Sequence, residues 1–138
     1  MRGEELKIKR LEIVEYPPPP SNAHWRNYTH LNPTWEQVET SIRALNHYCL
    51  PFMFIGLSEV EGNDDYLSVL GGPNGYSIDT PGKTYFDPTK TGGEIAVWTS
   101  DQGYYPKEQN VTYDIALVLK VARYFAEHGE RDPSVLWR

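Results

Sequence analysis

The sequence predicts an α+β fold, in which an antiparallel sheet of about five or six strands carries two main helices on one face. Two patterns of helical period, near residues 34–46 and 113–128, flank a run of short apolar segments. Turns rich in glycine and proline separate these segments at intervals of about 8–12 residues. Strands that follow one another without intervening helices favour an antiparallel sheet over a parallel one.

Residues 1–31 are predicted to form an N-terminal strand and a proline-rich extension. Apolar and polar residues alternate over 6–16 with an irregularity near Arg10, which is typical of an edge strand with a bulge. The four prolines at 17–20 end this strand, because proline has no N–H to donate to a ladder. Residues 21–31 show no clear period. An unpaired edge at 6–16 could also pair with another chain.

Residues 32–138 are predicted to form the rest of one compact domain, opening with a helix. Thr34 and Gln37 have the spacing of a capping box, and Pro33 suits the start of a helix. Asn46 is expected to end this helix in a left-handed conformation. The apolar positions share one face of the helix: Trp35, Val38, Ile42 and Leu45.

A meander of short strands is predicted to follow, at 52–57, 66–70, 76–79, 83–86 and 94–99. Residues 58–65 form an acidic loop between the first two of these strands. Thr80, Pro81 and Gly82 fit a tight turn with proline in its second position and glycine in its third. The chain therefore reverses direction several times within a short span.

The last predicted element is a second helix that begins after Thr112 and stops at Gly129. Its apolar stripe covers more than half of the circumference, so the helix is expected to be buried on more than one side. The stripe comprises Ile115, Leu117, Val118, Leu119, Val121, Ala122, Tyr124, Phe125 and Ala126.

Composition excludes several classes of protein. Aromatic residues make up 13% of the 138 residues, which argues against a disordered chain. The 13 Lys and Arg against 19 Asp and Glu give a net charge of −6, which disfavours a nucleic-acid binder. No apolar stretch is long enough for a membrane span or a secretory signal, so a cytoplasmic location is the expectation. A single cysteine, Cys49, allows no intramolecular disulfide.

Three motifs approach an enzymatic signature and then fail. The Pro81–Thr84 stretch resembles the end of a phosphate-binding loop but lacks the first glycine and the following helix. His128 and Glu130 match half of the zinc-deaminase signature, and no cysteine pair follows them. His47 lies two residues from Cys49, with nothing in the sequence to lower the pKa of the thiol. We therefore expect no catalytic residue, no cofactor and no metal.

A binding surface remains, and the sequence offers two kinds of residue for it. The first is the acidic cluster of the 58–65 loop: Glu59, Glu61, Asp64 and Asp65. Such a cluster is either a solvated loop or a docking patch for a basic partner. The second is a set of aromatic residues that could be exposed as interface anchors: Tyr85, Tyr104 and Tyr105. The alternative for such aromatic residues is packing within the fold, which is preferred for Trp98 and stays open for Tyr104 and Tyr105.

Three sequence elements resemble the immunity proteins of bacterial polymorphic toxin systems, in particular the first immunity-protein family associated with deaminase toxins. One element is the helix that opens Asn32-Pro33-Thr34-Trp35-Glu36 and ends Arg43-Ala44-Leu45-Asn46. Another is the hairpin with Asp79, Thr84 and Asp87-Pro88, followed by Gly92-Gly93-Glu94. The third is the closing helix with its Asp132-Pro133-Ser134-Val135-Leu136-Trp137 ending.

The resemblance implies a protein that binds and neutralises one cognate toxin, a nucleic-acid deaminase by family habit, by covering its active site. A toxin that acts on nucleic acid usually has a basic cleft. Residues 27–138 carry 8 basic and 15 acidic residues, so the segment that resembles the family has a net charge of −7. The expected partner is therefore a basic toxin cleft, with no direct contact to nucleic acid or membrane.

Two other classes stay open. One is a small-molecule enzyme with a site on the sheet, built from Asp79, Tyr85, Asp87 and Glu94; a pocket containing a carboxylate of shifted pKa would favour it. The other is an accessory interaction domain that uses the proline segment at 17–20 as a ligand.

Overall fold

The structure is a computed structural model and describes residues 5–17, 25–60, 62, 65–100 and 103–138. It contains seven β-strands and two α-helices in these residues. Their bounds are β1 Arg10–Glu15, β2 Arg26–Leu31, α1 Trp35–Ala44, β3 Phe52–Gly56, β4 Tyr66–Gly72, β5 Gly75–Thr80, β6 Lys83–Phe86, α2 Ile115–His128 and β7 Leu136–Trp137. One turn of 3₁₀-helix, Glu108–Asn110, precedes α2.

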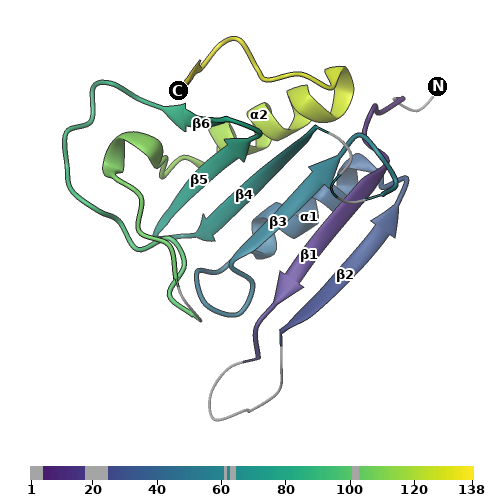
Figure 1. The fold of residues 1–138 in the computed structure, drawn as a ribbon, viewed down its shortest axis with the longest axis horizontal. Coiled ribbons are helices and arrows are strands. Elements are labelled where there is room, and N and C mark those ends of the chain that lie inside the picture. Colours follow the sequence, from purple (N-terminus) through teal and green to yellow (C-terminus); the bar gives the residue numbers. More distant parts are fainter. Residues whose placement is uncertain (1–4, 18–24, 61, 63–64, 101–102) are drawn as a thin grey trace.

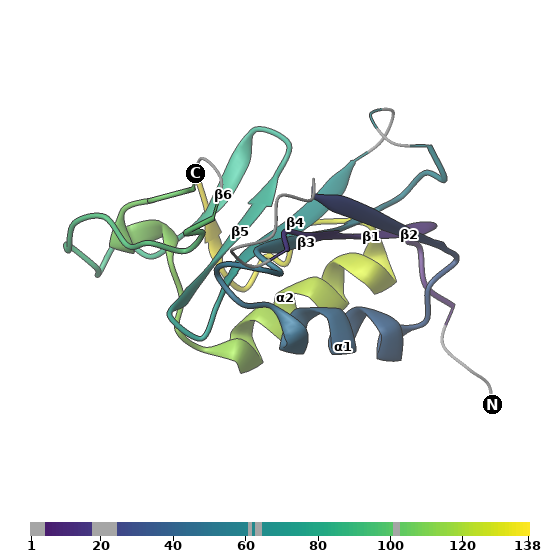
Figure 2. The ribbon, with the colours of Figure 1, turned by 90° about the horizontal axis from the view of Figure 1, so that it is seen from below.

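All seven strands form one antiparallel sheet in the order β2-β1-β3-β4-β5-β6-β7 (Figure 1). Figure 2 shows α1 and α2 side by side on one face of this sheet. The predicted α+β class and the placement of both helices on one face are thus confirmed. The sheet has more strands than predicted, because β2 and the short β7 were not expected.

The edge of the sheet differs from the prediction. β1 pairs with β2 on one side and with β3 on the other, so the expectation that it is an edge strand is wrong. β2 takes the edge position instead, with all six residues exposed. A strand with solvent on both faces needs no alternation of apolar residues, which explains why residues 21–31 gave no signal. Three of the four prolines, at 18–20, lie outside the described residues.

The core lies between the sheet and the two helices, and it uses the apolar faces that the sequence marks. Alternate residues of a strand point to opposite sides of a sheet. Those that point towards the helices are fully or almost fully buried. They include Leu11 from β1, Met53 and Ile55 from β3, Leu67 and Val69 from β4 and Ile78 from β5, against Val38 and Ile42 of α1 and Val118, Val121 and Phe125 of α2.

The helix ends agree only partly with the predicted caps. Thr34 caps α1 in a full capping box with Gln37, as predicted. Asn46 does not adopt a left-handed conformation; its side-chain oxygen accepts N–H bonds from the following turn, an alternative that asparagine offers locally. Asp114, not Thr112, caps α2, and Gly129 ends it at φ 71°, as predicted.

Residues 94–99, predicted as a strand, form no strand of the sheet. Glu94 pairs with Lys107 and Trp98 with Tyr104 as isolated bridges. This segment and the chain that returns from it lie beside β5, where the Tyr76 backbone exchanges hydrogen bonds with Thr112. The apolar residue of the segment, Val97, is fully buried in that position. Burial alone therefore accounts for its apolar character.

No helix covers the sheet face opposite α1 and α2 in the described residues, and segments at the margins of this face project above it. Figure 2 shows that the β5–β6 hairpin and the described ends of the β3–β4 connection project from this face. The hairpin turns at Pro81 and Gly82, where Gly82 has φ 78°, as the predicted turn requires. The raised margins make the open face concave. In the part of the chain that the structure describes, no helix is long and apolar enough to cross a membrane.

Candidate functional site

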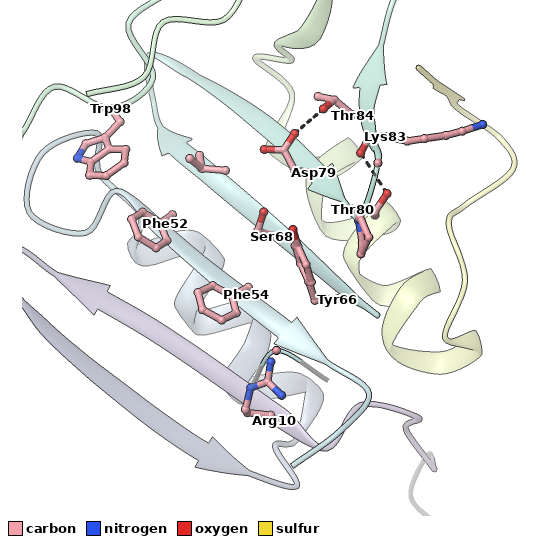
Figure 3. A pocket seen from close by; sticks show the side chains of 14 residues that line it. Arg10, Phe52, Phe54, Tyr66, Ser68, Asp79, Thr80, Lys83, Thr84 and Trp98 are labelled. Carbon is pink, nitrogen blue, oxygen red and sulfur yellow. Dashed lines mark hydrogen bonds between the residues drawn. The ribbon is translucent and has the colours of Figure 1, made fainter. Parts of the chain in front are cut away.

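The concave open face contains a hollow of about 830 Å³ (Figure 3). Its floor comes from β3 and β4, one wall from the β5–β6 hairpin, and its margins from the start of β1 and from Trp98. The lining side chains are Arg10, Phe52, Phe54, Tyr66, Ser68, Leu70, Asp79, Thr80, Pro81, Lys83, Thr84 and Trp98. The volume is in the range of small-molecule sites.

Aromatic rings form a continuous band along the floor. Phe52 and Phe54 are two residues apart on β3, so both point to the open face, with ring centroids 6.4 Å apart. Trp98 stands edge-on against Phe52 at 5.2 Å, and Tyr66 lies 6.5 Å from Phe54. The Tyr16 ring also packs against Trp98, with ring centroids 5.6 Å apart. These rings remain partly exposed, unlike the side chains on the helix-facing side.

Trp98 is held in place by hydrogen bonds at its indole nitrogen. Nε1 donates to Ser100 Oγ at 2.8 Å, and the Ser100 hydroxyl donates to the Tyr48 carbonyl. The bridge to Tyr104 fixes the backbone of the same residue. Packing of Trp98 within the fold is therefore confirmed. The opposite end of its ring system still lines the hollow.

Asp79 supplies the negative charge of the hollow. It lies on β5, opposite Ser68 of β4 and Thr84 of β6. Thr84 Oγ1 donates to Asp79 Oδ1 at 2.6 Å, while the other carboxylate oxygen points away from this bond (Figure 3). Burial raises the pKa of Asp79, and the bond from Thr84 opposes the rise. No described cation forms a salt bridge with this carboxylate.

Two further hydroxyl groups lie close to Asp79. Burial raises the pKa of the Tyr104 phenol, and the Asp79 carboxylate adds to the rise. Ser77 is fully buried on the same face of β5 as Asp79. Among the described residues its hydroxyl makes no hydrogen bond of normal geometry. The wall formed by β5 is thus rich in polar oxygen atoms.

A buried ion pair closes the end of the hollow near β1. Arg10 and Glu12 are 3% and 2% exposed, and Arg10 Nε lies 2.6 Å from Glu12 Oε2. Asn27 of β2 donates to the other Glu12 oxygen at 2.8 Å. Arg10 also donates to the carbonyl of Ser58 at 2.7 Å, which ties the β3–β4 connection to β1. This network forms the margin of the hollow, and the Glu12 carboxylate balances the charge of Arg10.

The structure gives the sequence-predicted site residues different surroundings. Glu59 and Asp65 are exposed on the β3–β4 connection, at the margin of the open face. Glu61 and Asp64 lie outside the described residues. Tyr105 is 49% exposed and Tyr104 is half-buried beside Asp79. Of the acidic cluster, only Glu59 and Asp65 are thus placed by the structure.

The expectation that Tyr85 is exposed is wrong. Tyr85 follows Thr84 on β6 and therefore points to the opposite side, into the core. Of the four residues of the enzyme alternative, only Asp79 lines the hollow. The Asp87 carboxylate accepts hydrogen bonds from the N–H and the hydroxyl of Thr89 in its own turn. Glu94 is exposed and does not line the hollow. The four residues do not assemble into one site.

Sequence reasoning missed the aromatic floor. The apolar run at 52–57 predicts a strand, but by itself it assigns neither Phe52 nor Phe54 to a binding surface. The distinguishing signal is the alternation of two aromatic residues with the smaller apolar Met53 and Ile55. That alternation predicts two different faces, with the rings on one of them.

No group of at least three His, Cys, Asp and Glu side chains comes together as a metal site in the described part of the chain. Comparison with known proteins gives no match to a family model, to a curated protein or to a solved structure. The resemblance to immunity proteins therefore stays a prediction from the sequence.

Proposed function

We propose that this protein is a non-catalytic immunity protein that binds a cognate bacterial toxin, a nucleic-acid deaminase, and covers its active site. The observation that carries the proposal is the concave, aromatic-lined open face of the sheet. Tyr and Trp side chains in a partly buried setting are typical anchors of protein interfaces. The rigid sheet beneath them holds the surface in shape before binding, which reduces the entropy lost on association.

Charge supports the same surface. The chain has a net charge of −6, and Glu59, Asp65 and Asp79 lie at or within the concave face. A deaminase that acts on nucleic acid needs a positively charged cleft to hold phosphates. Complementary charge speeds the encounter of the two proteins and orients them. The acidic face would thus occupy the cleft where the phosphate backbone otherwise binds.

Neutralisation in this way needs no chemistry from the immunity protein. A standard interface of about 1,600 Å² excludes nucleic acid from the cleft simply by occupying it. Only one carboxylate, Asp79, lines the hollow among the described residues, without the nucleophile–base pair that covalent catalysis uses. Stoichiometric inhibition is therefore the expected mode of action.

Co-expression with the toxin encoded beside the gene tests the proposal. Growth of the host should be restored, and the two proteins should co-purify as a stable complex. A toxin variant with an inactivated active site is the control for binding without toxicity. Growth arrest that persists at high levels of the folded protein, with no complex, would refute the proposal.

The raised pKa of Asp79 within a hollow favours one second candidate, a small-molecule enzyme. In that case Asp79 would exchange a proton with a bound substrate. The ratio of the two proteins at full protection separates the candidates. An inhibitor protects only when it equals the toxin in amount, whereas an enzyme that removes a toxic product protects at a small fraction of that amount.

A further inference from the structure

We propose that the hollow on the open face receives an arginine side chain of the partner protein, with the guanidinium over the aromatic floor and against Asp79. The identity of the partner as a toxin rests on the proposed function. The chemistry of the hollow does not, because it follows from the rings, the carboxylate and the hydroxyl groups that line it.

The aromatic floor is suited to a cation. Phe52, Phe54, Tyr66 and Trp98 line one hollow, and neighbouring ring centroids are 5.2–6.5 Å apart. The face of an aromatic ring carries partial negative charge, and a cation within about 6 Å of its centroid is attracted to it. A planar guanidinium in the hollow can stack on one of these rings while another borders it.

Asp79 provides the counter-charge. Thr84 occupies one carboxylate oxygen, and the other makes no hydrogen bond to a described residue (Figure 3). A carboxylate that is partly removed from water without a cation is destabilised, which agrees with the raised pKa of Asp79. An incoming cation would relieve this cost.

Within the described residues, no cation of the chain fills this position. Arg10 is held at the far margin by Glu12 and the Ser58 carbonyl. Lys83 also borders the hollow, but its ammonium is directed away from Asp79 (Figure 3). The charge of Asp79 therefore stays unmatched within the described residues until a partner brings a cation.

Arginine fits better than lysine because the wall offers several acceptors. Besides Asp79, the hydroxyl groups of Ser68 and Thr84 line the hollow. Guanidinium has five N–H donors in one plane and is weakly hydrated, so it can bond several oxygens and stack on a ring at once. The compact lysine ammonium gains less from the rings and keeps more of its water.

Binding of capped single amino acids to the isolated protein tests the inference without the toxin. The probes are Nα-acetyl-arginine amide, the lysine analogue, and the citrulline analogue, which has nearly the shape of arginine without the charge. Each is titrated to about 50 mM, a range that covers the millimolar dissociation constants expected of one ion contact and one ring contact. Chemical shifts of the Trp98 indole and of β3–β5 amides report the site.

The arginine probe should give saturable shifts at Trp98 and Ser68, and bind at least about fivefold more tightly than the lysine probe. The citrulline probe should give no saturable shifts. Asp79→Asn should weaken arginine binding at least about tenfold, which corresponds to roughly 1.4 kcal/mol. Asp87→Asn is the matched control, because Asp87 also accepts from a nearby threonine but lies outside the hollow.

Equal binding of arginine and citrulline, or no saturable arginine binding by the folded wild-type protein, would overturn the inference. These outcomes do not depend on Asp79→Asn being folded. They also separate the two proposals. A protein that binds arginine in the hollow but fails to rescue cells refutes only the immunity function, whereas rescue without arginine binding refutes only the use of the hollow.

Discussion

Asp79 and Asp87 show how local surroundings decide what a carboxylate can do. Both accept a hydrogen bond from a threonine hydroxyl, Asp79 from Thr84 and Asp87 from Thr89. Burial raises the pKa of Asp79, whereas the two bonds from Thr89 lower the pKa of the solvated Asp87. The sequence predicted both as members of one possible site. Asp79 lies in a hollow because the β5–β6 hairpin forms one of its walls. No local sequence pattern encodes this position.

The raised pKa of Asp79 makes stability depend on pH. Its carboxyl group binds a proton more tightly in the folded than in the unfolded protein, so stability falls as pH rises from the ordinary pKa of 3.8 through the raised value. Asp79→Asn removes this term. The variant should gain stability relative to wild type across that pH window, as measured by urea unfolding. A difference that does not change with pH would contradict the prediction.

The buried ion pair between Arg10 and Glu12 should contribute strongly to stability. Glu12→Ala removes the carboxylate that accepts hydrogen bonds from Arg10 and Asn27. The free energy of unfolding, measured by chemical denaturation, should fall by about 3 kcal/mol. The control is Glu39→Ala, which breaks the exposed pair with Arg43 and should cost at most about 0.5 kcal/mol. Similar losses for the two variants would show that burial does not matter here.

At the scale of elements, the sequence predicted what is encoded locally. The Thr34 capping box and the Gly129 stop depend on a few neighbouring residues, and both are confirmed. Two segments whose structure depends on distant partners were mispredicted. β2 is held by pairing with β1, and its exposed residues carry no pattern. Residues 94–99 look like a strand because Val97 is buried, but only isolated bridges form there.

The cap of α1 gives a direct measure of the local signal. Thr34→Ala removes the oxygen that accepts from Gln37 N–H, and should lower the free energy of unfolding by about 1 kcal/mol. Thr40→Ala is a matched control on the exposed surface of the same helix and should be neutral or slightly stabilising, because alanine favours helix. Thermal or urea unfolding measures both. Equal effects would mean that the box contributes nothing.

At the scale of the whole molecule, the proposed function depends on the fact that the helices cover only one face of the sheet. Both helices lie on one face, which leaves the other face of a seven-stranded sheet to the solvent (Figure 2). The sequence predicted this two-layer arrangement and the acidic loop beside it. It did not predict the aromatic floor, since the hollow depends on register between β3, β4 and β5. Charge and shape therefore become a site only in the assembled sheet.

The acidic margin should act mainly on the rate of association with the toxin. Replacing Glu59 and Asp65 by lysine should slow association about tenfold at low salt and flatten its salt dependence. Glu36→Lys combined with Glu94→Lys makes the same change in net charge away from the hollow and should have a smaller effect. Stopped-flow mixing at several salt concentrations measures both. Equal slowing would mean that only net charge matters.

The affinity of the purified toxin for two matched tyrosine variants tests most directly whether the open face is the binding surface. Tyr66 lines the hollow and is 36% exposed, whereas Tyr113 is 50% exposed just before α2 and does not line it. Tyr66→Arg should weaken the complex at least about 100-fold, because it removes an anchor and places a positive charge before a basic cleft. Tyr113→Arg should stay within about twofold of wild type. A larger loss at Tyr113 than at Tyr66 would contradict the open face as the toxin-binding surface.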